Sequence, residues 1–133
     1  MHDFTLPALA TIGIVVLLFV LAFHVGKMRG VTKIDAPAMS GHPLLERAIR
    51  VQMNTIESVL LLLPLMWIYA AFGSPSVAAL MGGLWIVARI WYAKAYMADP
   101  SKRTHSFVAG MLTIVVLFIA ATWSVLARLI MSA

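Results

Sequence analysis

Four long stretches of almost uninterrupted apolar residues make up most of the chain. They cover about residues 6–25, 44–72, 77–97 and 104–131, the second of them with a more polar beginning. A helix of about 20 apolar residues is long enough to cross the roughly 30 Å hydrocarbon core of a bilayer. The pattern therefore predicts four transmembrane helices.

The segments between these stretches carry the residues that end helices and form turns. Residues 26–43 hold three glycines and two prolines, residues 73–76 read Gly-Ser-Pro-Ser, and residues 99–101 read Asp-Pro-Ser. Connections this short place neighbouring helices antiparallel in a bundle. The sequence thus predicts an all-α integral membrane protein, with residues 1–133 forming a single four-helix membrane domain.

The composition excludes a soluble domain. Hydrophobic residues make up 62% of the 133 residues and charged residues only 11%, whereas soluble domains carry about 25% charged residues. The net charge of +5 does not indicate nucleic-acid binding, because the basic residues form no long run. Cysteine is absent. Any thiol chemistry must therefore use a thiol that belongs to a ligand.

Basic residues gather at one end of the predicted bundle. The first connection and its flanks carry five of them and the third carries three: Lys27, Arg29, Lys33, Arg47, Arg50, Lys94, Lys102 and Arg103. The turn between the second and third helices carries no charge. Basic loops stay on the cytoplasmic side of a membrane. We therefore expect loops one and three in the cytoplasm and both termini on the opposite side.

Two groups of polar residues fall at helical spacing within or beside the apolar stretches. Each group occupies one stripe of its helix, with Arg50, Asn54 and Glu57 on the second helix and Arg89, Tyr92 and Tyr96 on the third. Ionisable side chains at membrane depth are costly and mark a pathway or a binding site. We infer a site for a charged, multifunctional small molecule at the edge of the bilayer.

The polar residues suit a peptide-like anion that has two carboxylates, an amine and a thiol. Arg50 and Arg29 can bind carboxylates bidentately, because the guanidinium group is planar and always charged. The carboxylate of Glu57 suits an ammonium group. Asn54 and Gln52 can donate hydrogen bonds to amides and accept them, although Gln52 points away from the Arg50 stripe.

Aromatic and cationic side chains near the third connection complete such a site. Tyr92 and Tyr96 each offer a flat apolar wall and a hydroxyl group. A free thiol with a pKa of about 8.5 is mostly protonated at neutral pH, and only its thiolate is a nucleophile. A cation such as Arg103 lowers the pKa of a nearby thiol, so we expect Arg103 to act on the thiol of the ligand.

Structural roles compete with these binding roles. Glu57 and Arg89 could instead form an interhelical ion pair, which would be a poor source of stability. We expect Trp85 and Trp91 to lie at the membrane interface, and the two tyrosines could do the same. The histidines are widely separated in the sequence, so we expect no metal site.

Two motifs resemble those of the MAPEG family, the membrane-associated proteins in eicosanoid and glutathione metabolism. Residues 46–57 (ERAIRVQMNTIE) are similar to the family signature E-R-x-x-R-x-x-x-N-x-x-E, and residues 88–96 contain an R-x-x-Y-x-x-x-Y segment. The four spans and the basic loops match as well. The resemblance implies a homotrimer of four-helix subunits. It also implies glutathione as a co-substrate, bound in a cleft between neighbouring subunits that opens towards the cytoplasm.

The resemblance carries individual roles to this chain. The implied glutathione-binding residues are Arg29, Arg50, Gln52, Asn54, Glu57, Tyr92 and Tyr96. Arg103 matches the arginine implied to activate the glutathione thiol, across a preceding loop of different length. Two departures concern specificity. Ser58 and Val59 follow the motif where many members have Tyr-Pro, and Phe107 replaces a tyrosine early in the fourth helix.

The resemblance favours a glutathione transferase of the membrane that serves in detoxification. Such an enzyme would conjugate glutathione to lipophilic electrophiles or reduce lipid hydroperoxides. The short chain is similar to bacterial members, which implies the inner membrane. One alternative is a non-catalytic lipid-binding scaffold of the same family, which Arg50 and Glu57 disfavour. Another is a small four-span transporter of cationic drugs, which the arginines beside Glu57 disfavour by repulsion.

Overall fold

The computed structural model describes residues 3–132 and contains four long helices and one short one. These are α1 (Thr5–Thr32), α2 (Pro43–Phe72), α3 (Pro75–Ala98), the 3-10 helix η1 (Pro100–Arg103) and α4 (Thr104–Ser132). Each long helix is apolar enough to cross a membrane. The all-α fold with four membrane-spanning helices is therefore confirmed.

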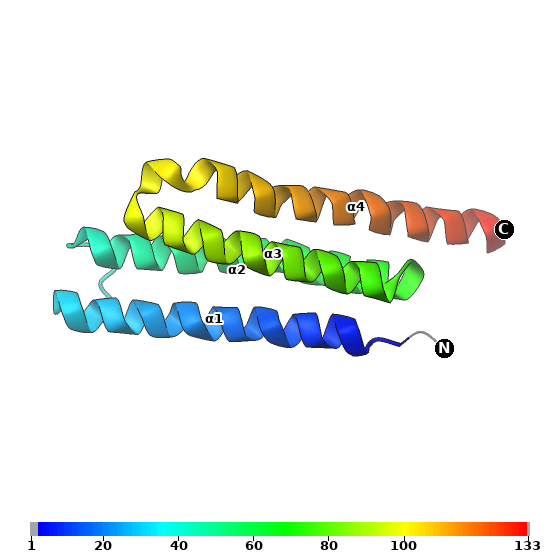
Figure 1. Cartoon of the computed structure of the whole chain (residues 1–133). Coiled ribbons are helices and arrows are strands. Elements are labelled where there is room, and N and C mark those ends of the chain that lie inside the picture. Colours follow the sequence, from blue (N-terminus) through cyan, green and yellow to red (C-terminus); the bar gives the residue numbers. More distant parts are fainter. Residues whose placement is uncertain (1–2, 133) are drawn as a thin grey trace.

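The helices form a bundle in which α2 and α3 occupy the middle. Figure 1 shows α1 and α4 on opposite sides of them, and each of these outer helices packs against both α2 and α3. The two chain ends lie at one end of the bundle. The α1–α2 connection and η1 lie at the other, which we call the loop end.

The first helix is longer than its apolar stretch. It continues past the expected residue 25 and through Gly26 to Thr32, although a glycine inside a helix costs about 1 kcal/mol. Packing explains the extension, because Val25 and Met28 are buried against the first turns of α2. The helix ends where Lys33 adopts a left-handed backbone conformation.

Short polar residues start the later helices. The His42 side chain accepts a hydrogen bond from the Leu44 backbone, and the Ser74 hydroxyl accepts one from the Val77 backbone. Asp99 begins η1 and accepts hydrogen bonds from both the backbone N–H and the hydroxyl of Ser101. These bonds hold the pKa of Asp99 below its ordinary value. They also define the turn that carries Arg103.

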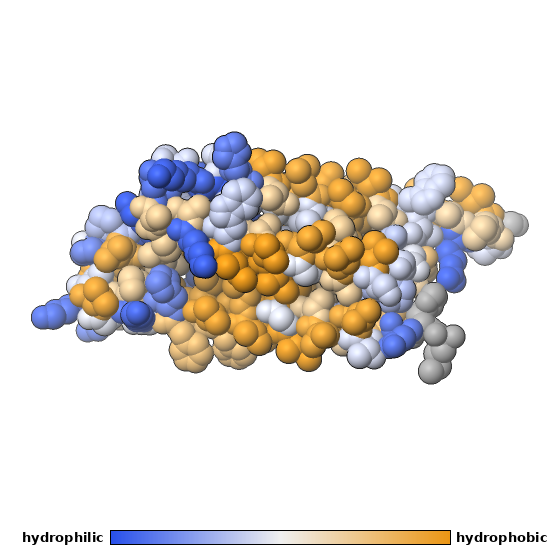
Figure 2. Space-filling model, viewed as in Figure 1, coloured by the Kyte–Doolittle hydropathy of each residue, from blue (hydrophilic) through white to orange (hydrophobic). Residues whose placement is uncertain are grey.

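The helices approach one another closely in the core at Gly82 of α3. A Cβ atom there would lie 2.7 Å from the Met66 sulfur and 3.3 Å from the Ala10 side chain. Gly82 thus lets α3 contact α1 and α2 together. The outward faces of the helices are covered with exposed apolar side chains, and Figure 2 shows them as a band between two more hydrophilic ends. Such an apolar band between polar ends suits a protein that lies within a bilayer.

Two tryptophans tie the helices together through hydrogen bonds. Trp85 Nε1 donates to the Ser58 hydroxyl at 3.0 Å, and Trp67 Nε1 donates to the Thr11 hydroxyl at 3.1 Å. The interfacial position expected for Trp85 is wrong, because its side chain is completely buried. Ser58 satisfies the indole N–H there, which removes the need for water. Trp91 is 51% exposed on the outer surface.

Candidate functional site

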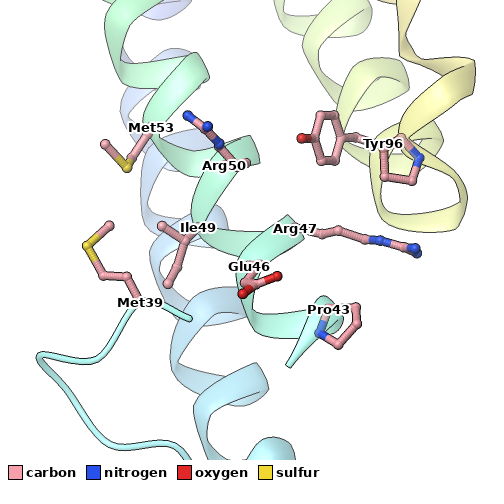
Figure 3. A pocket seen from close by; sticks show the side chains of 9 residues that line it. Met39, Pro43, Glu46, Arg47, Ile49, Arg50, Met53 and Tyr96 are labelled. Atoms are coloured by element: carbon pink, nitrogen blue, oxygen red, sulfur yellow. The ribbon is translucent and has the colours of Figure 1, made fainter. Parts of the chain in front are cut away.

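A pocket of about 550 Å³ opens at the loop end of the bundle. It lies between the start of α2, the end of α3 and the α1–α2 connection, as Figure 3 shows. Its lining residues are Met39, Pro43, Glu46, Arg47, Ile49, Arg50, Met53, Tyr96 and Pro100. The pocket therefore joins one residue of each predicted stripe, Arg50 from α2 and Tyr96 from α3.

Arg50 is the cation of this pocket that remains available to a ligand. Its side chain is exposed, and within residues 3–132 it forms no hydrogen bond or ion pair. Arg47 is engaged instead. It donates to the carbonyl oxygens of Met97 at 3.1 Å and Ala98 at 3.5 Å, and so caps the last turn of α3. The neighbouring Glu46 carboxylate accepts from the Gly41 backbone.

A hydrogen bond between two of the predicted residues supports the pocket from inside the bundle. Asn54 Nδ2 donates to the Tyr92 hydroxyl at 2.7 Å, which links α2 to α3. Tyr92 is fully buried, and its ring centroid lies 5.7 Å from that of Tyr96. Figure 3 shows the Tyr96 hydroxyl directed from α3 towards α2. The inner tyrosine thus positions the outer one.

Arg89 lies against the ring of Tyr92. Helical spacing placed it on the α3 stripe, but it was not among the predicted binding residues. Its guanidinium carbon is 4.7 Å from the Tyr92 ring centroid, 5.7 Å from that of Trp85 and 5.9 Å from that of Phe107. The residue is only 2% exposed, and Nε and Nη1 are buried without hydrogen-bond partners. The three rings offer the cation its stabilisation, through cation–π attraction.

The predicted alternative of an ion pair between Glu57 and Arg89 is not formed among the residues that the structure describes. Glu57 is exposed on α2, two turns further into the bundle than Arg50, and does not line the pocket. Gln52 is half-buried and also lies outside the pocket lining. Within one chain, these two residues therefore do not meet the Arg50–Tyr96 pocket.

Arg29 holds the connection beside the pocket. One of its guanidinium nitrogens donates to the Ala38 carbonyl at 2.6 Å and to the Ile34 carbonyl at 3.4 Å. Met39, which directly follows Ala38 in the chain, lines the pocket. In one chain Arg29 therefore shapes the wall of the pocket without lining it.

Arg103 stands beside the pocket rather than in it. Its guanidinium carbon lies 5.4 Å from the Tyr96 ring centroid, and its side chain is exposed. The backbone carbonyl of Arg103 accepts a hydrogen bond from Ser106, so η1 is joined firmly to α4. This arrangement puts two guanidinium groups, Arg50 and Arg103, near the same tyrosine. Residues 3–132 contain no cluster of histidine and acidic residues that could hold a metal ion.

Comparison with known proteins identifies the family. Residues 7–123 match the sequence profile of the MAPEG family, and the chain belongs to that family. An uncharacterised protein of Synechocystis sp. is 37% identical over 123 residues, which cover 92% of this chain and 90% of that protein. The match spans nearly the whole of both proteins.

Two mammalian enzymes of stated activity are also similar. Microsomal glutathione S-transferase 2 of Mus musculus is 30% identical over 107 residues, which cover 80% of this chain and 73% of the mouse protein. Leukotriene C4 synthase of Bos taurus is 28% identical over 96 residues, 72% of this chain and 64% of the bovine protein. The match to the bovine enzyme thus spans less than two thirds of its length. These relatives support a glutathione-related function in a membrane.

Proposed function

We propose that this protein is a membrane-bound glutathione S-transferase whose glutathione site is the pocket at the loop end. The observation that carries the proposal is the convergence of Arg50 and Tyr96 on one pocket, with Arg103 beside the same tyrosine. The name of the mouse relative, a microsomal glutathione S-transferase, points to the same co-substrate. The sequence of the chain supplies no thiol, so the nucleophile is that of glutathione.

Different side chains bind different groups of glutathione. The free guanidinium of Arg50 binds a glutathione carboxylate, which its planar fork matches. Tyr96 forms a wall beside the peptide, and the Asn54–Tyr92 hydrogen bond holds that wall in place. Arg103 stabilises the thiolate and so lowers the pKa of the glutathione thiol. Binding and positioning of the thiolate are the catalytic contribution of the protein.

The apolar co-substrate reaches the site from the lipid phase. The thiolate sulfur attacks an electrophilic carbon and forms a carbon–sulfur bond, while the leaving group departs with the displaced electron pair. With a lipid hydroperoxide, the thiolate sulfur attacks the terminal peroxide oxygen and the O–O bond breaks, so the lipid alcohol leaves after protonation and glutathione becomes its sulfenic acid. The thiol of a second glutathione then attacks the sulfenic sulfur, which forms the disulfide and releases water. Both reactions use the same thiolate, so the site needs no nucleophile of its own.

We propose that the active form is a homotrimer. Glu57 is a carboxylate exposed at membrane depth, and its neighbours Ile56, Leu60 and Leu61 are exposed as well. A charge facing lipid is costly, so the exposed α2 face packs against another copy of the chain. Contact between subunits would bring Glu57 to the ammonium group of glutathione. It would also bring Arg29 and Gln52 to a neighbouring subunit's pocket.

We further propose that the loop end faces the cytoplasm of a bacterial cell, across its inner membrane. The basic residues of both connections lie at that end, and the two termini lie at the other. The positive-inside rule then places the glutathione pocket in the compartment that holds reduced glutathione.

An activity screen on the purified protein tests the proposed function. The assay supplies glutathione with a general aryl halide or with a lipid hydroperoxide, and calorimetry measures glutathione binding directly. We expect heat of binding and turnover of at least one substrate, both reduced by Arg50→Gln. The matched control is Arg128→Gln, an exposed arginine at the other end of the bundle. A protein that gives neither heat nor turnover is a non-catalytic scaffold, and the proposal is then wrong.

A further inference from the structure

A second cavity lies between α1 and α3, apart from the glutathione pocket. This α1–α3 groove has a volume of about 390 Å³, which falls in the range of roughly 300–1,000 Å³ for small-molecule sites. Its walls are apolar side chains such as Leu17 and Leu21 of α1 and Ile90 and Ala93 of α3. None of its lining residues belongs to the lining of the glutathione pocket.

The polar residues of the groove are both at the end nearer the loops. His24 of α1 and Lys94 of α3 line it there, and no acidic side chain is among its described lining residues. Lys27 follows His24 by three residues and is exposed, so it lies on the same side of α1. The groove therefore runs from an apolar floor inside the membrane to a basic end near the lipid headgroups.

One ring nitrogen of His24 has no hydrogen-bond partner among residues 3–132. This atom, Nε2, is buried. Buried polar atoms are normally satisfied, and a hydrogen-bonding group of a ligand in the groove would satisfy this one. Lys94 is exposed and free of ion pairs in the described chain. The unsatisfied Nε2 points to a ligand in the groove, and the free ammonium group of Lys94 beside apolar walls points to an anion with an apolar tail.

We propose that the α1–α3 groove binds an anionic phospholipid of the surrounding bilayer. One acyl chain lies against Leu21 and Ala93, and the phosphate group meets Lys94 and Lys27. The groove is open along its side, because Val20 and Ile90 in its wall are exposed. A lipid with two chains can thus keep the second chain in the bilayer. Basic pockets between transmembrane helices recognise anionic headgroups in this way.

Lipid retention by the purified full-length protein tests the proposal. The protein is exchanged into detergent, incubated with phosphatidylglycerol or phosphatidylcholine of identical acyl chains, and analysed by native mass spectrometry. We expect several-fold more phosphatidylglycerol than phosphatidylcholine on the wild type. Each lysine near an anionic surface contributes enough to change affinity about fivefold. Lys94→Gln should therefore lower phosphatidylglycerol retention by about that factor.

Two further variants separate the groove from the general charge of the surface. Lys102→Gln removes an equally exposed lysine from η1, outside the groove, and should retain lipid as the wild type does. Ala93→Phe fills the groove and should reduce retention of both lipids. Equal retention of the two lipids by the wild type would overturn the proposal, as would equal losses from Lys94→Gln and Lys102→Gln. A wild-type oligomer that retains no lipid would also overturn it, since another copy then covers the groove.

Discussion

The polar stripes of α2 and α3 have nearly the same spacing but opposite surroundings. Arg50 and Glu57 of α2 are exposed, whereas Arg89 and Tyr92 of α3 are 2% and 0% exposed. Helical periodicity decides which residues share a face. The partner helices decide where that face points. The α3 stripe lies against α4, where Gly110 leaves room beside Arg89: a Cβ atom there would still be 3.7 Å from Nε.

Arg50 and Arg89 therefore have different roles. Arg50 is free of partners in residues 3–132 and lines an open pocket, so it is placed to bind a ligand. Arg89 is enclosed by aromatic rings, and its guanidinium group lies over the ring of Tyr92. It supports the binding surface without forming it. Changes to one stripe should alter glutathione binding, and changes to the other should act mainly through the position of Tyr92.

The largest effect should come from Arg50→Gln. Glutamine keeps a similar length but loses the charge that holds a glutathione carboxylate. A hydrogen bond to a charged group contributes about 2 kcal/mol, so the Kd for glutathione should rise roughly 30-fold. Calorimetry measures the Kd, and thermal unfolding in detergent should show no loss of stability because Arg50 makes no internal bond. An unchanged Kd would show that Arg50 of α2 does not bind glutathione.

The hydrogen bond between the stripes should show itself in a double-mutant cycle of Asn54→Leu and Tyr92→Phe. Each single change leaves one fully or partly buried polar group without its partner, which costs about 1 to 3 kcal/mol when the group is buried. The double variant leaves neither group, so its loss should be smaller than the sum of the single losses. Thermal unfolding of the four proteins measures the coupling. Additive losses would mean that the hydrogen bond between Asn54 and Tyr92 contributes no coupling energy between α2 and α3.

Arg89→Met should change stability by less than about 1 kcal/mol, because replacing a buried charge with an apolar side chain of similar shape is often neutral or stabilising. Glutathione affinity should nevertheless fall several-fold, since the Tyr92 ring loses the cation that positions it. A folding defect would instead lower the stability of the protein. A large loss of thermal stability with unchanged affinity would show that Arg89 acts only in folding.

Asp99 should give the smallest effect, a pH dependence at the turn that carries Arg103. Its pKa is lowered from the ordinary 3.8 by hydrogen bonds from Ser101. A carboxyl group whose pKa is lowered by folding stabilises the fold above its unfolded value, and the contribution is lost as the pH falls through the folded value. The thermal midpoint should therefore drop slightly on acidification below that range. The thermal midpoint of Asp99→Asn should fall less on acidification than that of the wild type. An equal fall in both proteins would show that other groups cause it.

Much of the architecture could be predicted because local signals specify it. Each apolar stretch is longer than a core helix requires, and proline and glycine mark the turns. The membership of the polar stripes also follows from helical spacing. The burial of Trp85 could not be predicted in this way, because it depends on Ser58 of another helix. The same is true of Arg29, whose carbonyl partners lie in an irregular connection.

The site itself was predictable in its residue types more than in its geometry. Arg50 and Tyr96 share a pocket as the chemistry required, but Glu46 and Arg47, which also line it, were not predicted as binding residues. The i, i+4 spacing of Glu46 and Arg50 could have signalled that they share a face. The depth of Glu57 relative to the pocket depends on how two helices are aligned, which no local pattern specifies.

The ionisation of bound glutathione is the property that Arg103 is proposed to control. The ultraviolet absorbance of the thiolate is recorded at neutral pH as glutathione saturates the wild type, Arg103→Gln and the matched control Lys102→Gln. We predict a thiolate signal in the wild type and the control, and its loss in Arg103→Gln although glutathione still binds. A thiolate signal of the same size in Arg103→Gln would contradict the role of the guanidinium group beside Tyr96.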